Sequence, residues 1–445
     1  MLTLSISIKR DEPGWRAANE RARRQEVEHL LSKLNIEALK VRASQLKRGV
    51  KCSIPLPSYD KATITEVMGG TNYHIPILFA DGDSWMCRIH RTNIAAPPPD
   101  LLSRILQSEV TTMQFLATTR IPVPRIHDFA FTPDNPVGIP YILMDRIDGR
   151  PMYWPELRPF EKTKILQQYA DIVLELSRHP FPSIGCLQPS TSSPWQVGPI
   201  VFDSHADRDS QGQLSLPGPF TSSTQYRRDL ILRHLDQIKT DQTHPKRRLE
   251  SYLMHLFLLE SIPRIVQHEQ SPGFYLKHAD DKGDHILVDI DMNIVGIIDW
   301  EWAQTCPKAE AFCAPVCLVP KVDYHNGDNV LGEDELHFAE ILEAKGGHEL
   351  AEYVRRGRME HRVSHCVGCE ADDRTYFENM FTGLRGALLR PKEGVQNWRA
   401  WKRHALERYQ DDEALQQILL TESDDDEEEI PELLHLQMSH PFPIR

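Results

Sequence analysis

Short apolar runs separated by turn residues mark the chain between residues 65 and 150. The run 75–78 is followed by the turn Asp81-Gly82-Asp83 and by a second run, 85–89, which is the pattern of a β-hairpin. The run 141–147 predicts a further strand. Residues 101–116 instead place apolar side chains three or four positions apart, which is typical of a helix. This region is therefore expected to form strands with one helix.

Helical spacing of apolar residues dominates most of the remaining chain. Residues 20–47, rich in Leu, Ala, Arg and Glu, predict one long amphipathic helix before the strands. The same spacing predicts helices in 160–179, 226–238, 245–267 and 334–420. The stretch 188–223, rich in Ser, Pro and Gly, predicts a long loop or an insertion. We expect an α+β fold, with a small lobe of antiparallel strands plus a helix and a larger, mainly helical lobe.

A second predicted hairpin gathers carboxylates near residue 290. Apolar runs at 286–288 and 294–298 flank the turn 291–293. Five carboxylates border these runs: Asp280, Asp281 and Asp284 before the first, and Asp299 and Glu301 after the second. Like charges held together repel unless a cation relieves them, and Mg²⁺ binds one or two carboxylates with phosphate oxygens. The pattern favours a metal–nucleotide site, although Asp beside a strand is usually a solvated turn residue.

The spacing of His278, Asp280, position 285 and Asp299 resembles the catalytic and metal-binding loops of the aminoglycoside phosphotransferase family. In kinases a His-x-Asp motif is followed by an Asn five residues after the Asp, and a later Asp holds Mg²⁺. His278-Ala279-Asp280 matches the first motif, and 298–301, Ile-Asp-Trp-Glu, matches the family's second. Matching segments run in order from about Thr65 to Pro307.

This resemblance implies a protein-kinase-like two-lobe fold, as in fungal-type small-molecule kinase homologues. It also implies ATP-dependent phosphorylation of a hydroxyl group on a small molecule. Asp280 would orient or deprotonate the acceptor, His278 would order the loop, and Asp299 would hold Mg²⁺. The identity of the acceptor does not follow from the fold.

The resemblance places a nucleotide site upstream of these loops. Gly69 and Gly70 precede the first hairpin, where glycines let backbone N–H groups approach phosphates, although a Gly-Gly pair is more often only a turn. Arg88 occupies the position of the kinase strand lysine. Glu109, among apolar helix positions, is its expected partner unless it is simply exposed. The strand 141–147 leads to the base-binding hinge in the family, which adds these candidates: Met144, Asp145, Arg146 and Ile147. A plain core strand explains its apolar residues equally well.

His285 departs from the family pattern, which has a metal-binding Asn there. Neutral imidazole is a poor Mg²⁺ ligand, so one metal position is in question. His285 either bonds to Asp280 or the loop backbone while Asp299 alone holds Mg²⁺, or Asp284 replaces the Asn as ligand. The third interpretation is a pseudokinase, an interaction protein that binds nucleotide or nothing. Lys282 is either near the transferred phosphate or solvated.

Composition narrows the class of protein. The net charge of −13 includes seven acidic residues in 422–429, an acidic run that is either a solvated tail or a contact for a basic partner. The chain shows no basic stripe with interleaved aromatics, no apolar run long enough to span a membrane and no secretory signal. We therefore expect a cytoplasmic protein with a small-molecule substrate, without nucleic-acid or membrane partners.

The chain is expected to have four parts. An N-terminal helical extension (1–60) precedes the small lobe (61–148). The mainly helical large lobe (149–420) carries the catalytic loop at 278–301, and the acidic tail (421–445) is expected to be disordered.

Overall fold

The structure of the protein is a computed structural model that describes residues 13–55, 67–93, 96–240, 247–269, 273–368, 373–389 and 397–421. The chain divides into two compact units. The first comprises Met1–Tyr226, Glu269–Val319 and Leu331–Gly357, and the second Arg227–His268, Pro320–Val330 and Arg358–Arg445. The acidic run 422–429 and Thr65 lie outside the described residues.

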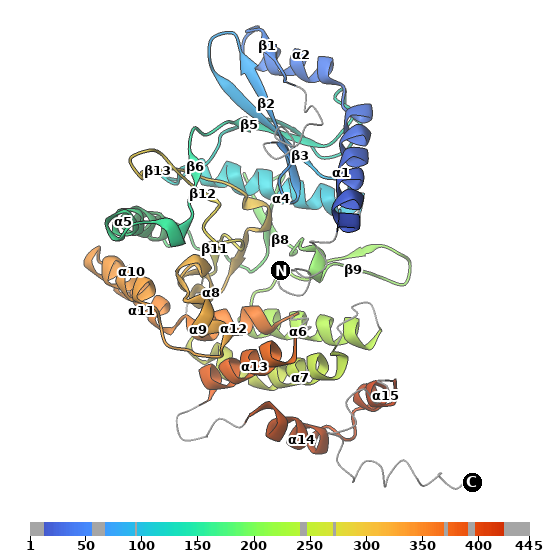
Figure 1. Ribbon diagram of the computed structural model, residues 1–445, viewed down its shortest axis with the longest axis vertical. Helices are drawn as coiled ribbons and strands as arrows, with labels where there is room; N and C mark the ends of the chain where they lie inside the picture. Colours follow the sequence, from blue (N-terminus) through green and yellow to red (C-terminus); the bar gives the residue numbers. More distant parts are fainter. Residues whose placement is uncertain are drawn as a thin grey trace. The chain divides into compact units, whose positions relative to one another are not determined.

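A five-stranded antiparallel sheet belongs to the first unit (Figure 1). Across the sheet the strands are β1 (Cys52–Ser53), β2 (Asn72–Phe79), β3 (Ser84–His90), β5 (Tyr141–Asp145) and β4 (Ile126–Ala130). In the hairpin of β2 and β3, Ile75 lies opposite Cys87 and Leu78 opposite Ser84. The predicted hairpin and the strand after residue 140 are therefore confirmed.

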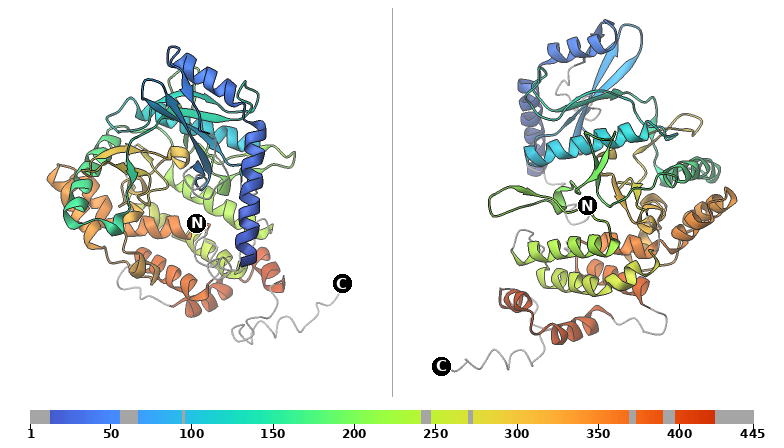
Figure 2. Two further views of the ribbon diagram at one scale, coloured as in Figure 1. Left: turned by 45° about the horizontal axis from the view of Figure 1, so that its top comes forward. Right: turned by 180° about the vertical axis from the view of Figure 1, so that it is seen from behind.

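The sheet separates two hydrophobic layers. Ile142 is buried in a cluster with Leu106 of α4 (Pro99–Leu116), which runs alongside the sheet (Figures 1 and 2). Its neighbour Leu143 is buried in the other cluster, with residues of α1 (Pro13–Lys33) and α2 (Ile36–Leu46). Because successive strand residues point to opposite faces, one strand serves both layers.

The expectation of a single helix over 20–47 is wrong, since α1 and α2 are separate. The break falls at Leu34 and Asn35. The side chain of Asn35 accepts a hydrogen bond of 3.0 Å from the N–H of Ala38, which is the geometry of a helix N-cap. A local cap thus overrides the continuous helical spacing.

The rest of the first unit holds the expected hairpin and helices. Its remaining strands are β6 (Arg150–Pro151), β7 (Cys186–Gln188), β8 (Gln196–Gly198), β9 (Asp207–Arg208), β10 (Leu214–Ser215), β11 (Tyr275–Lys277), β12 (Ile286–Val288), β13 (Ile294–Ile297) and β14 (Gln304–Cys306). Its helices are η2 (Trp154–Glu156), α5 (Pro159–Leu176), η3 (Asp203–His205), η5 (Trp300–Trp302), α8 (Lys308–Ala311), η6 (Val316–Leu318), α10 (Glu333–Ala344) and α11 (His348–Arg356). The predicted loop 188–223 thus contains short strands.

The described part of the second unit is helical. It contains most of α6 (Ser223–Lys239), then α7 (Arg248–Ile265), η4 (Val266–His268), α9 (Lys321–His325), α12 (Arg358–Cys366), α13 (Arg374–Leu388), α14 (Trp398–Arg408) and α15 (Glu413–Thr421). Phe381 packs edge-on against Trp398 in its core. Among the residues that the structure describes, no helix combines the length and apolar character of a membrane span.

Candidate functional site

The hairpin of β12 and β13 brings the two acidic segments to one end. Ile286 lies opposite Ile297, and the N–H of Ile298 donates to the carbonyl of His285 at 3.0 Å. The chain that precedes β12 therefore lies beside the chain that follows β13. This confirms the second predicted hairpin and places residues 280–285 next to residues 298–301.

Asp299 adopts a left-handed backbone conformation, with φ 63° and ψ 46°. Few non-glycine residues adopt this conformation, and Asp is among those that tolerate it. The turn ends β13 and leaves the carboxylate of Asp299 43% exposed, whereas Trp300 and Glu301 are buried. Strained backbone at an exposed carboxylate is common at functional sites.

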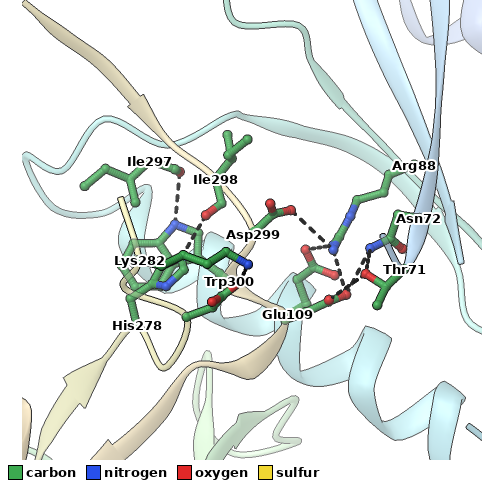
Figure 3. A network of polar contacts seen from close by, with 12 residues as sticks. Thr71, Asn72, Arg88, Glu109, His278, Lys282, Ile297, Ile298, Asp299 and Trp300 are labelled. Carbon is green, nitrogen blue, oxygen red and sulfur yellow. Dashed lines mark hydrogen bonds and ion pairs between the residues drawn. The ribbon is translucent and has the colours of Figure 1, made fainter. Parts of the chain in front are cut away.

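A buried guanidinium, that of Arg88 on β3, lies among three carboxylates (Figure 3). Its Nη1 donates to Oε1 of Glu109 on α4, so the expected pair is present. Its Nη2 donates to Oε2 of Glu301 at 2.6 Å and lies 3.5 Å from Oδ1 of Asp299. The Arg88 side chain is only 4% exposed. A single cation thus joins β3, α4 and the segment after β13.

Glu301 also joins this cluster to the loop before β2. It accepts hydrogen bonds from Thr71 Oγ1 at 3.0 Å and from Asn72 Nδ2 at 3.1 Å (Figure 3). From the sequence, Glu301 is only one of several acidic residues near the hairpin, and no pattern assigns a role to Thr71 or Asn72. Polar residues directly after the Gly69-Gly70 pair were the one available signal.

The carboxylates differ in their protonation. Burial raises the pKa of Glu301, but the attraction of Arg88 and the hydrogen bond from Asn72 outweigh it and leave this pKa below its usual value. Burial also raises the pKa of Glu109, here to about 8; Arg88 opposes this rise, while the charges of Glu301 and Asp299 add to it. Burial therefore makes Glu109 the more readily protonated of these two glutamates.

His278 and His285 form a stacked pair beneath the hairpin. Their ring centroids are 4.1 Å apart, and His278 Nε2 lies 2.8 Å from the carbonyl of Ile298, to which it donates. Trp300 packs edge-on against His278 (Figure 3). Burial lowers the pKa of both imidazoles, so both rings are neutral. His278 therefore fixes the turn before Asp299, and His285 lies within the loop with 2% exposure.

Lys282 holds two of the loop carboxylates together. Its Nζ lies 2.8 Å from Oδ2 of Asp280 and 3.7 Å from Oδ2 of Asp284. The three side chains are all more than a third exposed. The candidate base Asp280 and the candidate metal ligand Asp284 thus both face the ammonium group of Lys282.

The remaining nucleotide candidates lie at two positions on the sheet. Gly69 begins the turn before β2, where its N–H donates to the carbonyl of Asn72 at 2.8 Å. At the end of β5, Met144 is buried, and Asp145 accepts a 2.6 Å hydrogen bond from His127. The carboxylate of Asp145 is therefore engaged within the sheet. The base-binding role of Met144, Asp145, Arg146 and Ile147 stays a prediction.

Comparison with known proteins identifies the family. Residues 78–307 match the model of the phosphotransferase enzyme family, APH. The matched residues make up more than half of the chain. Subtelomeric hrmA-associated cluster proteins of two Aspergillus fumigatus strains are 26% identical over 258 residues, 45% of this chain and 50% of theirs. The chain thus spans about half the length of these curated relatives.

Two solved structures illustrate the likeness. A putative fructosamine-3-kinase from Thermobifida fusca is 14% identical over 78% of this chain and 98% of its own, with a TM-score of 0.46. The GDP complex of wild-type aminoglycoside 2'-phosphotransferase-IIIa is 16% identical over 72% and 90% of the two chains, with a TM-score of 0.41. From the match of its family model, the chain belongs to the phosphotransferase enzyme family.

Proposed function

We propose that the chain is an ATP-dependent phosphotransferase that acts on a hydroxyl group of a small molecule in the cytoplasm. The observation that carries the proposal is the junction at Arg88. This one buried cation contacts Glu109 and Glu301 and approaches Asp299, at the end of the hairpin that also presents Asp280. Phosphoryl transfer depends on this kind of fixed charge around phosphates.

The donor set fits Mg²⁺ bound together with nucleotide phosphates. Within the described ranges, no group of three or more His, Cys, Asp or Glu side chains could hold a metal ion. Mg²⁺ needs no such cage, because it takes one or two carboxylates and completes its shell with phosphate oxygens and water. Asp299 is the half-exposed carboxylate suited to this, and Asp284 is the second candidate. When bound, Mg²⁺ neutralises charge on the phosphates.

His285 fits this metal less well than Asp284 does. It is neutral, buried and stacked on His278, and imidazole prefers softer ions than Mg²⁺. We therefore propose that His285 supports the loop through this stack. Among the three interpretations of the sequence, the proposal selects the one in which Asp284 replaces the Asn as a metal ligand.

Each of these residues has a proposed role in the transfer of the phosphoryl group. Asp280 takes the proton from the acceptor hydroxyl, whose oxygen then forms a bond to the γ-phosphorus while the bond from this phosphorus to the bridging oxygen of ADP breaks. Arg88 and the Gly69–Gly70 turn bind the phosphates. Lys282, close to Asp280, faces the transferred group and stabilises its charge.

Two measurements test the proposal. Calorimetry of the full chain with Mg-ATP is expected to show binding, and a screen of hydroxylated metabolites is expected to reveal one that releases ADP. Asp280→Asn should keep ATP binding and lose turnover by about 10²–10⁴-fold, the usual contribution of a general base. The proposal fails if the wild type binds no Mg-ATP.

A nucleotide-binding interaction protein is the second candidate, and the histidine at position 285 favours it. Such a pseudokinase would bind ATP through the Arg88 cluster without transferring phosphate. Equal affinity for ATP and equal absence of turnover in the wild type and in Asp280→Asn, across the metabolite screen, would support this candidate against the enzyme.

A further inference from the structure

Arg91, at the end of β3, connects helix α1 to the glycine turn. Its Nη1 donates to the carbonyls of Gly69 and Gly70, each at 2.9 Å. Its Nε and Nη2 donate to the two carboxylate oxygens of Glu26 on α1, at 2.9 and 2.8 Å. One guanidinium therefore bonds the turn with one nitrogen and the helix with the other two.

These contacts fix the direction of two peptide groups. The peptides that join Gly69 to Gly70 and Gly70 to Thr71 are trans, so each N–H points opposite to the carbonyl of the same peptide. With both carbonyls bound to Arg91, the N–H groups of Gly70 and Thr71 point away from it. Among the described residues, neither N–H donates to a protein acceptor. Two adjacent N–H groups on one side of a turn, away from Arg91, can donate to the oxygens of an anion.

The connection to α1 is built into the protein. The side chains of Arg91 and Glu26 are 13% and 8% exposed. Burial raises the pKa of Glu26, but the hydrogen bond and charge of Arg91 hold it below its usual value, so the pair is ionised at neutral pH. Next to Glu26, Val27 is buried in the cluster that covers the sheet. Helix α1 is thus anchored by its apolar face, while its acidic residue holds Arg91.

We propose that Glu26 and Arg91 are positioning residues that keep the Gly69–Gly70 turn in an anion-binding conformation for nucleotide phosphates. Helix α1, which lies outside the matched residues 78–307, then helps to position the phosphate-binding turn of the nucleotide site. This inference rests on the proposed function, because it takes the bound anion to be the phosphate chain of ATP.

Calorimetry of full-length variants with Mg-ATP and with adenosine, which lacks phosphates, tests the inference. Glu26→Gln and Arg91→Gln should weaken ATP binding about tenfold, as expected for lost charge-assisted hydrogen bonds, and leave adenosine binding unchanged. Arg91→Lys keeps the positive charge but loses the two-pronged guanidinium contact with Glu26. Its affinity for ATP should therefore lie between those of the wild type and Arg91→Gln. The control is Arg42→Gln, which breaks a bidentate pair with Asp128 between α2 and β4 and should affect neither ligand.

The outcomes separate the inference from the proposed function. If the wild type binds ATP and both Gln variants bind it equally well, or lose ATP and adenosine to the same degree, the positioning role is overturned and the proposed function stands. Wild-type protein that binds no ATP would overturn both. Retained adenosine binding in the variants shows that they are folded.

Discussion

Replacing Arg88 by Met removes the guanidinium that two buried glutamates share. The Met side chain is apolar and of similar reach, so the packing around β3 is largely kept. Glu109 and Glu301 are almost fully buried and lose their common cation. Loss of one partner from a buried ion pair costs about 3–5 kcal/mol, because the other charge stays in a site without solvent.

The dependence of stability on pH gives the cost of the lost cation in a second way, from the pKa of Glu301. In the wild type the pKa of Glu301 is lowered, so its charge adds stability that is present above the usual Glu value of 4.5 and lost as the pH falls. In Arg88→Met the charge of Arg88 no longer opposes burial, and the hydrogen bonds from Asn72 and Thr71 oppose it only in part. Burial then raises this pKa, so the stability is complete below 4.5 and lost as the pH rises. Keeping Glu301 protonated costs about 1.4 kcal/mol per pH unit above that value, or about 4 kcal/mol near pH 7.5. Near pH 5.5 the cost falls to about 1.4 kcal/mol.

Equilibrium unfolding in urea, followed by circular dichroism at both pH values, measures these differences. The matched control is Arg42→Met, which breaks an Arg–Asp pair of the same unit in which the Arg42 side chain is 47% exposed and the Asp128 side chain 14% exposed. Pairs with a solvent-exposed member contribute far less than buried ones, about 0–1 kcal/mol when both are exposed, so the control should lose distinctly less stability than Arg88→Met. Arg88→Met should lose about 3–5 kcal/mol near pH 7.5 and distinctly less near pH 5.5.

Either of two results would refute this reasoning. A loss in Arg88→Met no larger than that in Arg42→Met would mean that solvent reaches the cluster. A large loss that is the same at both pH values would mean that the cost comes from packing and not from an uncompensated carboxylate.

Three further variants probe the catalytic loop. Asp299→Asn should bind ATP with the same affinity in the presence and absence of Mg²⁺, whereas calorimetry of the wild type should show tighter binding with Mg²⁺; a retained Mg²⁺ effect would contradict the assignment. Lys282→Met should lower kcat by about 10–100-fold with little change in ATP affinity, and an unchanged kcat would mean that the lysine is only solvated. His285→Asn loses the stack with His278 and enlarges the cavity of about 30 Å³ that His285 lines. Its free energy of unfolding should therefore be about 1–3 kcal/mol lower than that of the wild type. A tenfold gain in its turnover would show instead that the histidine had disabled the loop.

Local sequence patterns predicted the family and the fold class. The expected resemblance is confirmed by the family match, and the α+β, kinase-like architecture by the antiparallel sheet and the helices that follow it. Both hairpins form with Ile75 opposite Cys87 and Ile286 opposite Ile297. These features follow from alternation and turn chemistry over a few residues, which a sequence displays directly. The Arg88–Glu109 pair followed from the family analogy.

Tertiary structure decided how distant segments share charges. The bonds of Glu301 to Thr71 and Asn72 join positions about 230 residues apart, and the bond of Glu26 to Arg91 joins α1 to β3. No spacing rule relates such positions, because their proximity depends on how whole elements pack. The sequence by itself therefore supplied the candidate residues for the chemistry of this site, but it gave no role to Thr71 or Asn72. Apart from the Arg88–Glu109 pair, only the packing showed which partner each of these buried charges has, since a charge removed from water must find its counter-ion wherever the fold brings one.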